Sequence, residues 1–192
     1  MTYDFDTPVD RSGTYSLKWE EAGDALPMWV ADMEFQTAPQ IRAALQQRLD
    51  HGIFGYSIVP PAWNQAYVDW WHRRHNLDID PESLVFSTGV VPAISSMVRK
   101  LTTANENVLI QTPVYNIFFN SIINNGCRVL ESPLEYDGSG HYSINWADLE
   151  SKLADPQTTL MILCNPHNPV GRIWDRDTLA RIGELCWNHH VT

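Results

Sequence analysis

Residues 165–171 read NPHNPVG, and the rest of the sequence is organised around this stretch. It lies between an apolar run, LMILC at residues 160–164, and a helical pattern that begins near Asp175. Proline fixes φ and lacks an amide donor, so two Asn-Pro pairs predict a rigid turn that holds a side chain such as Asn168 in place. Open α/β sheets bind ligands at the carboxyl ends of their strands, so the doubled motif favours a ligand site over an ordinary strand-to-helix turn.

The composition of the 192-residue chain is globular and acidic, with 44% hydrophobic residues and a formal net charge of −10. Such a chain can bury a substantial core, and the lack of any Lys or Arg run argues against a nucleic-acid partner. No stretch approaches the roughly 18 apolar residues of a membrane helix, and the start, MTYDFDTPVDR, has no signal-peptide pattern. We therefore expect a cytoplasmic protein that binds small molecules, with no nucleic-acid or membrane partner.

The three cysteines, Cys127, Cys164 and Cys186, are odd in number and lie in apolar surroundings. Their spacing is not that of metal ligands. The sequence therefore predicts buried, reduced thiols and no metal site.

Residues 1–35 have no persistent helical or strand period and are rich in aromatic and acidic side chains. We expect this N-terminal arm to lie on another part of the protein or on a second subunit, because it cannot bury its own surface. PMWVADMEF, at residues 27–35, is either an anchoring strand or a wall of the active site. A helix with one buried face follows, with Thr37 as its N-cap and Gly52 at its end, and Pro60 and Pro61 introduce a second helix.

From Leu84 onward, short apolar runs alternate with helical patterns, which is typical of βαβ units and a mainly parallel sheet. The expected strands are residues 84–86, 108–110, 127–134 and 158–164. The expected helices are residues 90–101, a run from 115 towards 126, one capped by Asn145, and one capped by Asp175. Val191 and Thr192 resemble the start of another strand, which predicts a chain that stops within the α/β alternation.

Three predicted strand ends carry groups that suit one kind of ligand. Residues 87–89 lead into a helix, and the free amides and positive dipole end of a helix N-terminus suit a phosphate. Tyr115 follows the next strand and can either lie flat on a planar ligand or simply pack. Asn168 follows a third strand. The nucleotide motifs GxGxxG and GxxxxGK[ST] are absent, so the combination favours pyridoxal phosphate.

Six stretches, DRSGTYSLKW, LPMWVADMEF, HGIFGYS, STGVV, TPVY and NPHNPVGRIW, occur in an order that resembles a known family. This family is the class I/II aminotransferases, which are fold-type I pyridoxal-phosphate enzymes. The resemblance is strongest to the cystathionine β-lyase (C-S lyase) branch of the maltose-regulon modulator type. It implies an α/β three-layer sandwich with a mainly parallel sheet, here incomplete, and an N-terminal arm.

The resemblance also implies roles for the residues in these stretches. The backbone amides of Gly89, Val90 and Val91 would hold the cofactor phosphate. Tyr115 would stack on the pyridine ring, and Asn168 would hydrogen-bond the phenolic oxygen of the ring.

The remaining implied contacts involve the substrate and a second subunit. Tyr56 would reach the phosphate of the neighbouring subunit's cofactor in a homodimer. The backbone near Ala31 would border the carboxylate of an amino-acid substrate, with Asn168 also close to the substrate.

Three motifs of the family have no counterpart in this chain: an S-x-S-K-type segment with the Schiff-base lysine, a D-E-x-H-type segment, and a late Arg. Lys18, Lys100 and Lys152 lie in sequence contexts unlike the Schiff-base segment. We interpret the chain as the N-terminal half of an enzyme, without a catalytic residue and inactive alone. Residues 1–49 would be the arm and first helix, within a small domain, and residues 50–192 the first half of the pyridoxal-phosphate-binding large domain.

The reaction implied for the complete enzyme is α,β-elimination of a cysteine S-conjugate such as cystathionine, which yields a thiol, pyruvate and ammonia. Transamination begins from the same carbanion, so an aminotransferase remains the alternative. A non-catalytic regulatory or binding protein is the alternative of another class.

Overall fold

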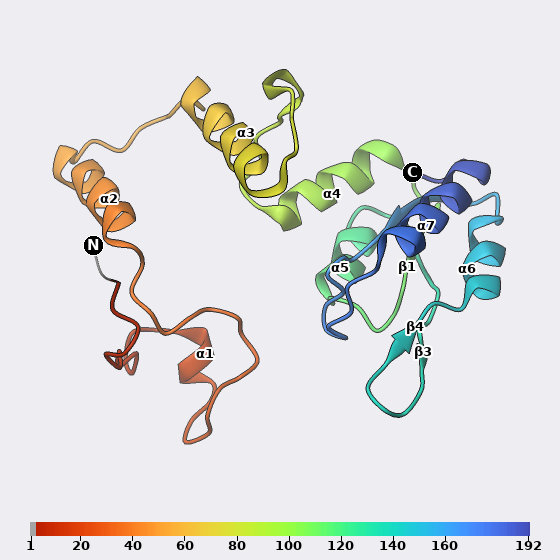
Figure 1. Ribbon diagram of the computed structural model, residues 1–192, viewed down its shortest axis with the longest axis horizontal. Helices are drawn as coiled ribbons and strands as arrows, with labels where there is room; N and C mark the ends of the chain where they lie inside the picture. Colours follow the sequence, from red (N-terminus) through yellow and green to blue (C-terminus); the bar gives the residue numbers. More distant parts are fainter. Residues whose placement is uncertain (1–2) are drawn as a thin grey trace. The chain divides into compact units, whose positions relative to one another are not determined.

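The computed structural model describes residues 3–192, and the chain divides into two compact units, Met1–Pro60 and Pro61–Thr192 (Figure 1). The first unit contains α1 (Leu17–Glu20) and α2 (Pro39–His51). The second begins with α3 (Pro61–His75). The domain boundary expected at residue 49 concerns a larger fold and stays a prediction.

A cluster of charged side chains organises the first unit. Arg11 forms an ion pair with Asp32 at 2.5 Å, and Lys18 forms one with Glu34 at 2.7 Å. Lys18 Nζ also donates to the Asp32 carbonyl at 2.8 Å, and the indole N–H of Trp19 donates to Glu34 at 3.2 Å. These bonds tie DRSGTYSLKW to LPMWVADMEF, two stretches that the sequence only shows as separate motifs.

PMWVADMEF does not form the anchoring strand that was one of its two interpretations. Its backbone bends at residues 29–30 and 34–35, and it pairs with no strand in the described part of the chain. The carboxylates of Asp32 and Glu34 hold this segment through side-chain bonds instead of a ladder.

Two expectations for the first helix are wrong. Ala38, not Thr37, occupies the N-cap of α2, because Pro39 takes the first helical position, where a missing N–H costs nothing. The apolar face is exposed rather than buried, since no element of the described first unit packs extensively along α2. The exposed side chains of this face are Ile41, Leu45 and Leu49. Gly52 does end the helix, in the left-handed conformation at φ 72°.

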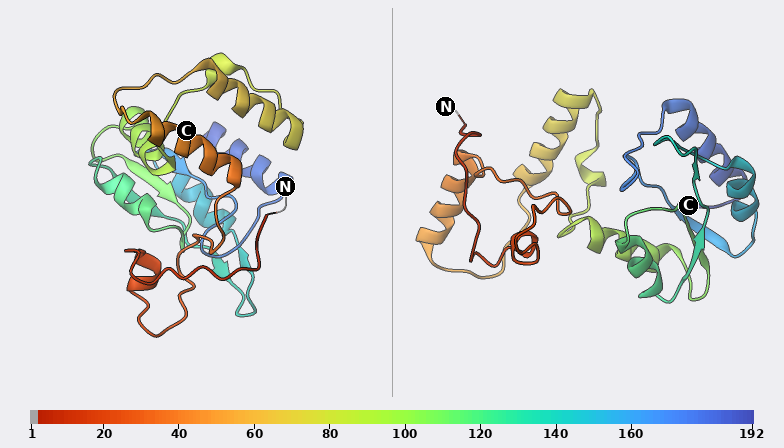
Figure 2. Two further views of the ribbon diagram at one scale, coloured as in Figure 1. Left: turned by 90° about the vertical axis from the view of Figure 1, so that its left-hand side faces the viewer. Right: turned by 90° about the horizontal axis from the view of Figure 1, so that it is seen from below.

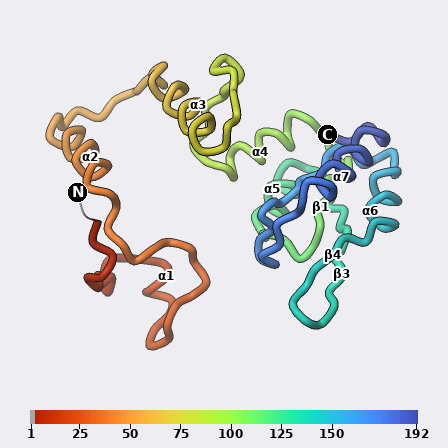
Figure 3. Tube along the Cα trace, viewed as in Figure 1, coloured from red at the N-terminus to blue at the C-terminus, as the bar shows by residue number. Residues whose placement is uncertain are grey.

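The second unit contains the α/β alternation that the sequence predicts (Figure 3). After α3 and the 3₁₀ turn η1 (Pro81–Ser83), its elements are α4 (Val90–Leu101), β1 (Asn107–Ile110), α5 (Ile117–Ile123), β2 (Arg128–Glu131), β3 (Glu135–Tyr136), β4 (Tyr142–Ser143), α6 (Trp146–Leu153), β5 (Thr158–Ile162) and α7 (Arg176–Asn188). Asn145 and Asp175 cap α6 and α7 as predicted, by accepting bonds from Asp148 N at 3.0 Å and Thr178 N at 2.8 Å.

Residues 84–86 do not form the predicted strand. Leu84 is extended, with φ −80° and ψ 124°, but this segment pairs with no strand among residues 3–192. The segment therefore has no neighbouring strand with which to form backbone hydrogen bonds, and Val85 is 90% exposed.

The main sheet has the strand order β2-β1-β5, and both pairings are parallel. Ile110, at the end of β1, lies opposite Glu131 of β2 and Ile162 of β5. Thr192 exchanges two backbone hydrogen bonds with β5, at 2.8 and 3.0 Å, which supports a strand start at residues 191–192. β3 and β4 form a separate antiparallel hairpin around the polar turn.

Two apolar clusters cover opposite faces of the main sheet, as expected when both faces of a parallel sheet are buried. Val108 and Ile110 pack with side chains of α4 and α5. Leu109, between them in sequence, packs with side chains of α6 and α7. The sheet therefore lies between two helical layers (Figure 2), which confirms the three-layer α/β class.

The three cysteines are free, and Cys127 is buried whereas Cys164 and Cys186 are partly buried. Within residues 3–192, no helix has the length and apolar character needed to cross a membrane. The same residues contain no group of three or more His, Cys, Asp or Glu side chains arranged to hold a metal ion.

Leu149 of α6 is fully buried in the cluster on the second face of the sheet, so its truncation tests this packing. We expect Leu149→Ala to lower the free energy of unfolding by about 2–5 kcal/mol, from lost burial and the cavity it leaves. Urea unfolding measures this change. The neighbouring Glu150→Ala, at an exposed position, is the matched control. Equal effects of the two substitutions would contradict the assigned core.

The charge cluster of the first unit predicts an acid transition. The bond from Lys18 holds the pKa of Glu34 below its ordinary value of 4.5, and the bond from Arg11 holds the pKa of Asp32 below 3.8. The cluster is therefore fully formed above pH 4.5 and is lost as the pH falls through these lowered values. Trp19 emission should change with a midpoint below pH 4.5 in a fluorescence titration. Trp19→Phe should remove this transition, and a midpoint above pH 4.5 would refute the assignment.

Candidate functional site

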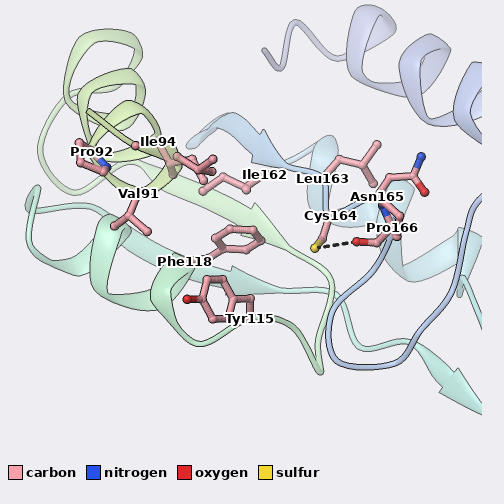
Figure 4. Close-up of a pocket in the computed structure, with 12 residues that line it drawn as sticks. Val91, Pro92, Ile94, Tyr115, Phe118, Ile162, Leu163, Cys164, Asn165 and Pro166 are labelled. Atoms are coloured by element: carbon pink, nitrogen blue, oxygen red, sulfur yellow. Dashed lines mark hydrogen bonds between the residues drawn. The ribbon is translucent and has the colours of Figure 1, made fainter. Parts of the chain in front are cut away.

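A cavity with a volume of about 550 Å³ lies in the second unit, beyond the carboxyl ends of β1 and β5. Three segments form its walls: residues 89–94 at the start of α4, the side chains of Tyr115 and Phe118, and residues 162–166 at the end of β5 (Figure 4). Adjacent parallel strands bring their carboxyl ends together, which is why segments distant in sequence share this site.

The first wall is the N-terminus of α4, with Gly89 as its N-cap. The amides of Val90 and Val91 have no partner within the helix, and Pro92 has no N–H, so these two are the donors available in the first turn. A Cβ at Gly89 would meet Pro92 Cδ at 3.6 Å, an ordinary contact. Glycine therefore leaves this edge of the cavity open without being required by packing in this chain.

The second wall consists of two aromatic rings after β1. Phe118, on α5, is 7% exposed and belongs to the core, whereas Tyr115, just before α5, is 41% exposed. The two rings meet edge to face, with centroids 6.0 Å apart. Figure 4 shows the Phe118 ring above the Tyr115 ring, both below the apolar end of β5. Phe118 therefore packs against Tyr115 and leaves part of the Tyr115 ring exposed.

The third wall belongs to the NPHNPVG loop, which follows β5. Asn165 and Pro166 line the cavity, and the thiol of Cys164 donates to the Pro166 carbonyl at 3.4 Å (Figure 4). Asn168 is exposed and lies just beyond the lining residues, with its backbone N–H bonded to Cys164 Sγ at 3.4 Å. The peptide bonds before Pro166 and Pro169 are cis.

His167, which the sequence does not single out, is 1% exposed and belongs to the loop of the third wall. Its Nε2 is 3.1 Å from the carbonyl of Pro113, in the loop that leads to Tyr115. Burial lowers the pKa of this imidazole below its ordinary value of 6.5, although the backbone carbonyls of Pro113 and Gln111 oppose the shift. The available sequence signal is a histidine between two prolines directly after a buried strand.

Gln111 is the other buried polar residue that sequence patterns leave unnoticed. It follows β1, is 2% exposed, and its side-chain oxygen and nitrogen have no hydrogen-bond partner among the described residues. His167 Nδ1 also has no hydrogen-bond partner by distance and angle among the described residues. Two buried polar side chains, Gln111 and His167, therefore lie where the strands of the sheet end.

The structure brings most of the predicted site residues together. Gly89, Val90, Val91 and Tyr115 line one cavity, and Asn168 belongs to the loop that forms its third wall. The two other predicted contacts, Ala31 and Tyr56, belong to the first unit. Both are exposed, and Tyr56 is fully so.

A family model, Aminotransferase class I and II, matches residues 27–192. Among curated proteins, the chain is 48% identical to cystathionine beta-lyase PatB of Bacillus subtilis (strain 168) and 36% identical to protein MalY of Escherichia coli (strain K12). Each alignment covers 98% of this chain and 50% of the relative, so the chain spans about half the length of the curated relatives it matches.

Solved structures give the same result. Cystalysin from Treponema denticola, which contains a pyridoxal 5'-phosphate cofactor, matches 100% of the chain with a TM-score of 0.90 and 34% identity. The PLP-bound C-S lyase from Staphylococcus hominis matches 100% with a TM-score of 0.89 and 32% identity. In both cases 50% of the solved chain is covered. By fold and by sequence, this chain belongs to the aminotransferase class I and II family.

Proposed function

We propose that this chain is the cofactor-binding half of a pyridoxal-phosphate-dependent carbon–sulfur lyase that acts on cysteine S-conjugates such as cystathionine. The observation that carries the proposal is the cavity itself, whose walls offer free backbone amides, a supported aromatic ring and a proline-fixed polar loop. The 48% identity to cystathionine beta-lyase PatB favours a lyase among the activities of the family.

The chemistry of the donors fits this cofactor. The free amides of Val90 and Val91, at the positive end of the α4 dipole, suit a phosphate, with Gly89 leaving the approach open. The partly exposed ring of Tyr115 suits a flat heteroaromatic ring. The volume of about 550 Å³ is within the range usual for small-molecule sites.

Pyridoxal phosphate, when bound, supplies an electron sink for a carbanion at the substrate Cα. The residues of this chain would bind the cofactor and orient it and the substrate. In this proposal the Asn168 side-chain amide would donate to the phenolic oxygen of the ring and border the substrate, and the backbone near Ala31 would border the substrate carboxylate. Tyr115 would stack on the ring.

A homodimer forms part of the proposal, with Tyr56 reaching the cofactor phosphate of the neighbouring subunit. The full exposure of Tyr56 supports this role, because its phenol is available to a second chain. The exposed apolar side chains of α2 also favour association.

The choice between lyase and aminotransferase is tested by product formation in the full-length enzyme. We expect cystathionine to give pyruvate without any keto-acid acceptor, because elimination needs no amino-group acceptor. Pyruvate release, coupled to lactate dehydrogenase, measures this with and without added 2-oxoglutarate. Formation of glutamate from added 2-oxoglutarate, without release of pyruvate, would instead identify an aminotransferase, and cofactor binding without either reaction would favour the non-catalytic alternative.

The lysine that attaches the cofactor is expected outside residues 1–192. Lys18 and Lys152 form ion pairs with Glu34 and Asp148. Lys100 lies in the last turn of α4, roughly 15 Å along the helix from its N-terminus. Borohydride reduction of the full-length holoenzyme followed by peptide mass spectrometry should place the adduct elsewhere. A stoichiometric adduct on one of these three lysines would refute this assignment.

A further inference from the structure

We propose that His167 is a positioning residue, whose imidazole fastens the loop that carries Asn168 to the loop that carries Tyr115. The inference rests on the proposed function for what these loops hold, and on the hydrogen bond between His167 and Pro113 for how they are held. His167 lies one residue before Asn168, and Pro113 lies two residues before Tyr115.

One hydrogen bond makes this connection. His167 Nε2 lies 3.1 Å from the Pro113 carbonyl oxygen, and a carbonyl can only accept, so the ring proton is on Nε2. The pyrrolidine ring of Pro113 fixes φ at this residue, and Pro166 and Pro169 restrict the backbone on either side of His167 in the same way. The hydrogen bond therefore joins two backbone segments that proline restricts.

The imidazole is itself held in place by the NPHNPVG turn. The backbone N–H of His167 donates to Arg172 O at 2.7 Å, and its carbonyl accepts from Gly171 N at 2.8 Å. Its ring meets Trp174 edge to face at 6.0 Å, and the backbone N–H of Trp174 donates to Asn165 Oδ1 at 3.1 Å. The turn thus closes on itself around His167, and Nε2 of the ring makes the hydrogen bond to the other loop.

Burial determines the chemical state of this side chain. Its pKa is lowered, so at neutral pH the ring is uncharged and has one donor, Nε2–H. Nε2 makes the hydrogen bond to the Pro113 carbonyl, and the Gln111 carbonyl, in the same loop, also acts on the ring by raising its pKa. Loss of that donor would free the Pro113 carbonyl and uncouple the loops.

The distance from Cβ to the donor nitrogen distinguishes this role from simple packing in the interior. The amide nitrogen of glutamine stands about as far from Cβ as Nε2 of histidine, whereas that of asparagine reaches only the position of Nδ1. His167→Gln can therefore keep the bond to Pro113, and His167→Asn and His167→Leu cannot. His141→Leu, at an exposed histidine outside the loop, is the matched control.

The experiment uses the full-length holoenzyme and measures pyridoxal-phosphate affinity, visible circular dichroism of the bound cofactor and thermal unfolding of the cofactor-free protein. We expect His167→Asn and His167→Leu to weaken cofactor binding on the order of tenfold, as for one buried hydrogen bond lost, and to reduce the dichroism. His167→Gln should restore both towards the wild-type values, and His141→Leu should change neither.

A double-mutant cycle tests whether His167 acts through Asn168. If it does, the loss of cofactor affinity in His167→Asn combined with Asn168→Ala should be clearly smaller than the product of the two single fold-changes. Independent effects, or lower stability of the cofactor-free protein with unchanged affinity and dichroism, would overturn the positioning role. Failure of the wild-type enzyme to bind pyridoxal phosphate would overturn the proposed function first, and the inference with it.

Discussion

The parallel pairing of β1 with β5 is the constraint on which the site depends. Ile110 and Ile162 end the two strands at the same level, so the segments that follow them leave the sheet side by side. One of these segments leads to Tyr115 and the other to Asn168. A shift of either strand by one residue would turn its side chains to the opposite face and separate the two loops.

The two buried faces of the sheet make such a shift costly. Val108 and Leu109 are both fully buried, on opposite faces, so a shift of β1 would expose apolar side chains or move them to the wrong layer. α4 packs on one of these faces through Val98, which brings its N-terminus to the same end of the sheet as the loops. The polar groups Gln111 and His167 appear inside only where the ladder stops, and there the chain can use them without interrupting strand pairing.

Sequence patterns predicted an element correctly where the interactions that define it join residues close together in the sequence. The bounds of α4 and the caps Asn145 and Asp175 follow from residues a few positions apart, and the structure confirms them. The strand at residues 84–86 and the buried face of α2 were wrong because each requires a neighbour, and the described chain supplies none. His167 was missed for a similar reason, since its partner carbonyl is 54 positions away. Of the predicted site residues, Gly89, Val90, Val91 and Tyr115 line the cavity, whereas the sequence patterns overlooked Phe118 and the buried His167.

The cavity walls also determine how an anion would be held. None of the lining side chains within the described chain carries a charge, and this chain spans about half the length of its curated relatives. From this half, a phosphate would be held by short-range donors: the amides of Val90 and Val91 together with a helix dipole equivalent to about half a positive charge. Such donors bind well only at hydrogen-bond distance, whereas a charged side chain tolerates displacement. Backbone donors therefore require walls that hold their position, and two proline-containing loops joined through a buried imidazole meet that requirement.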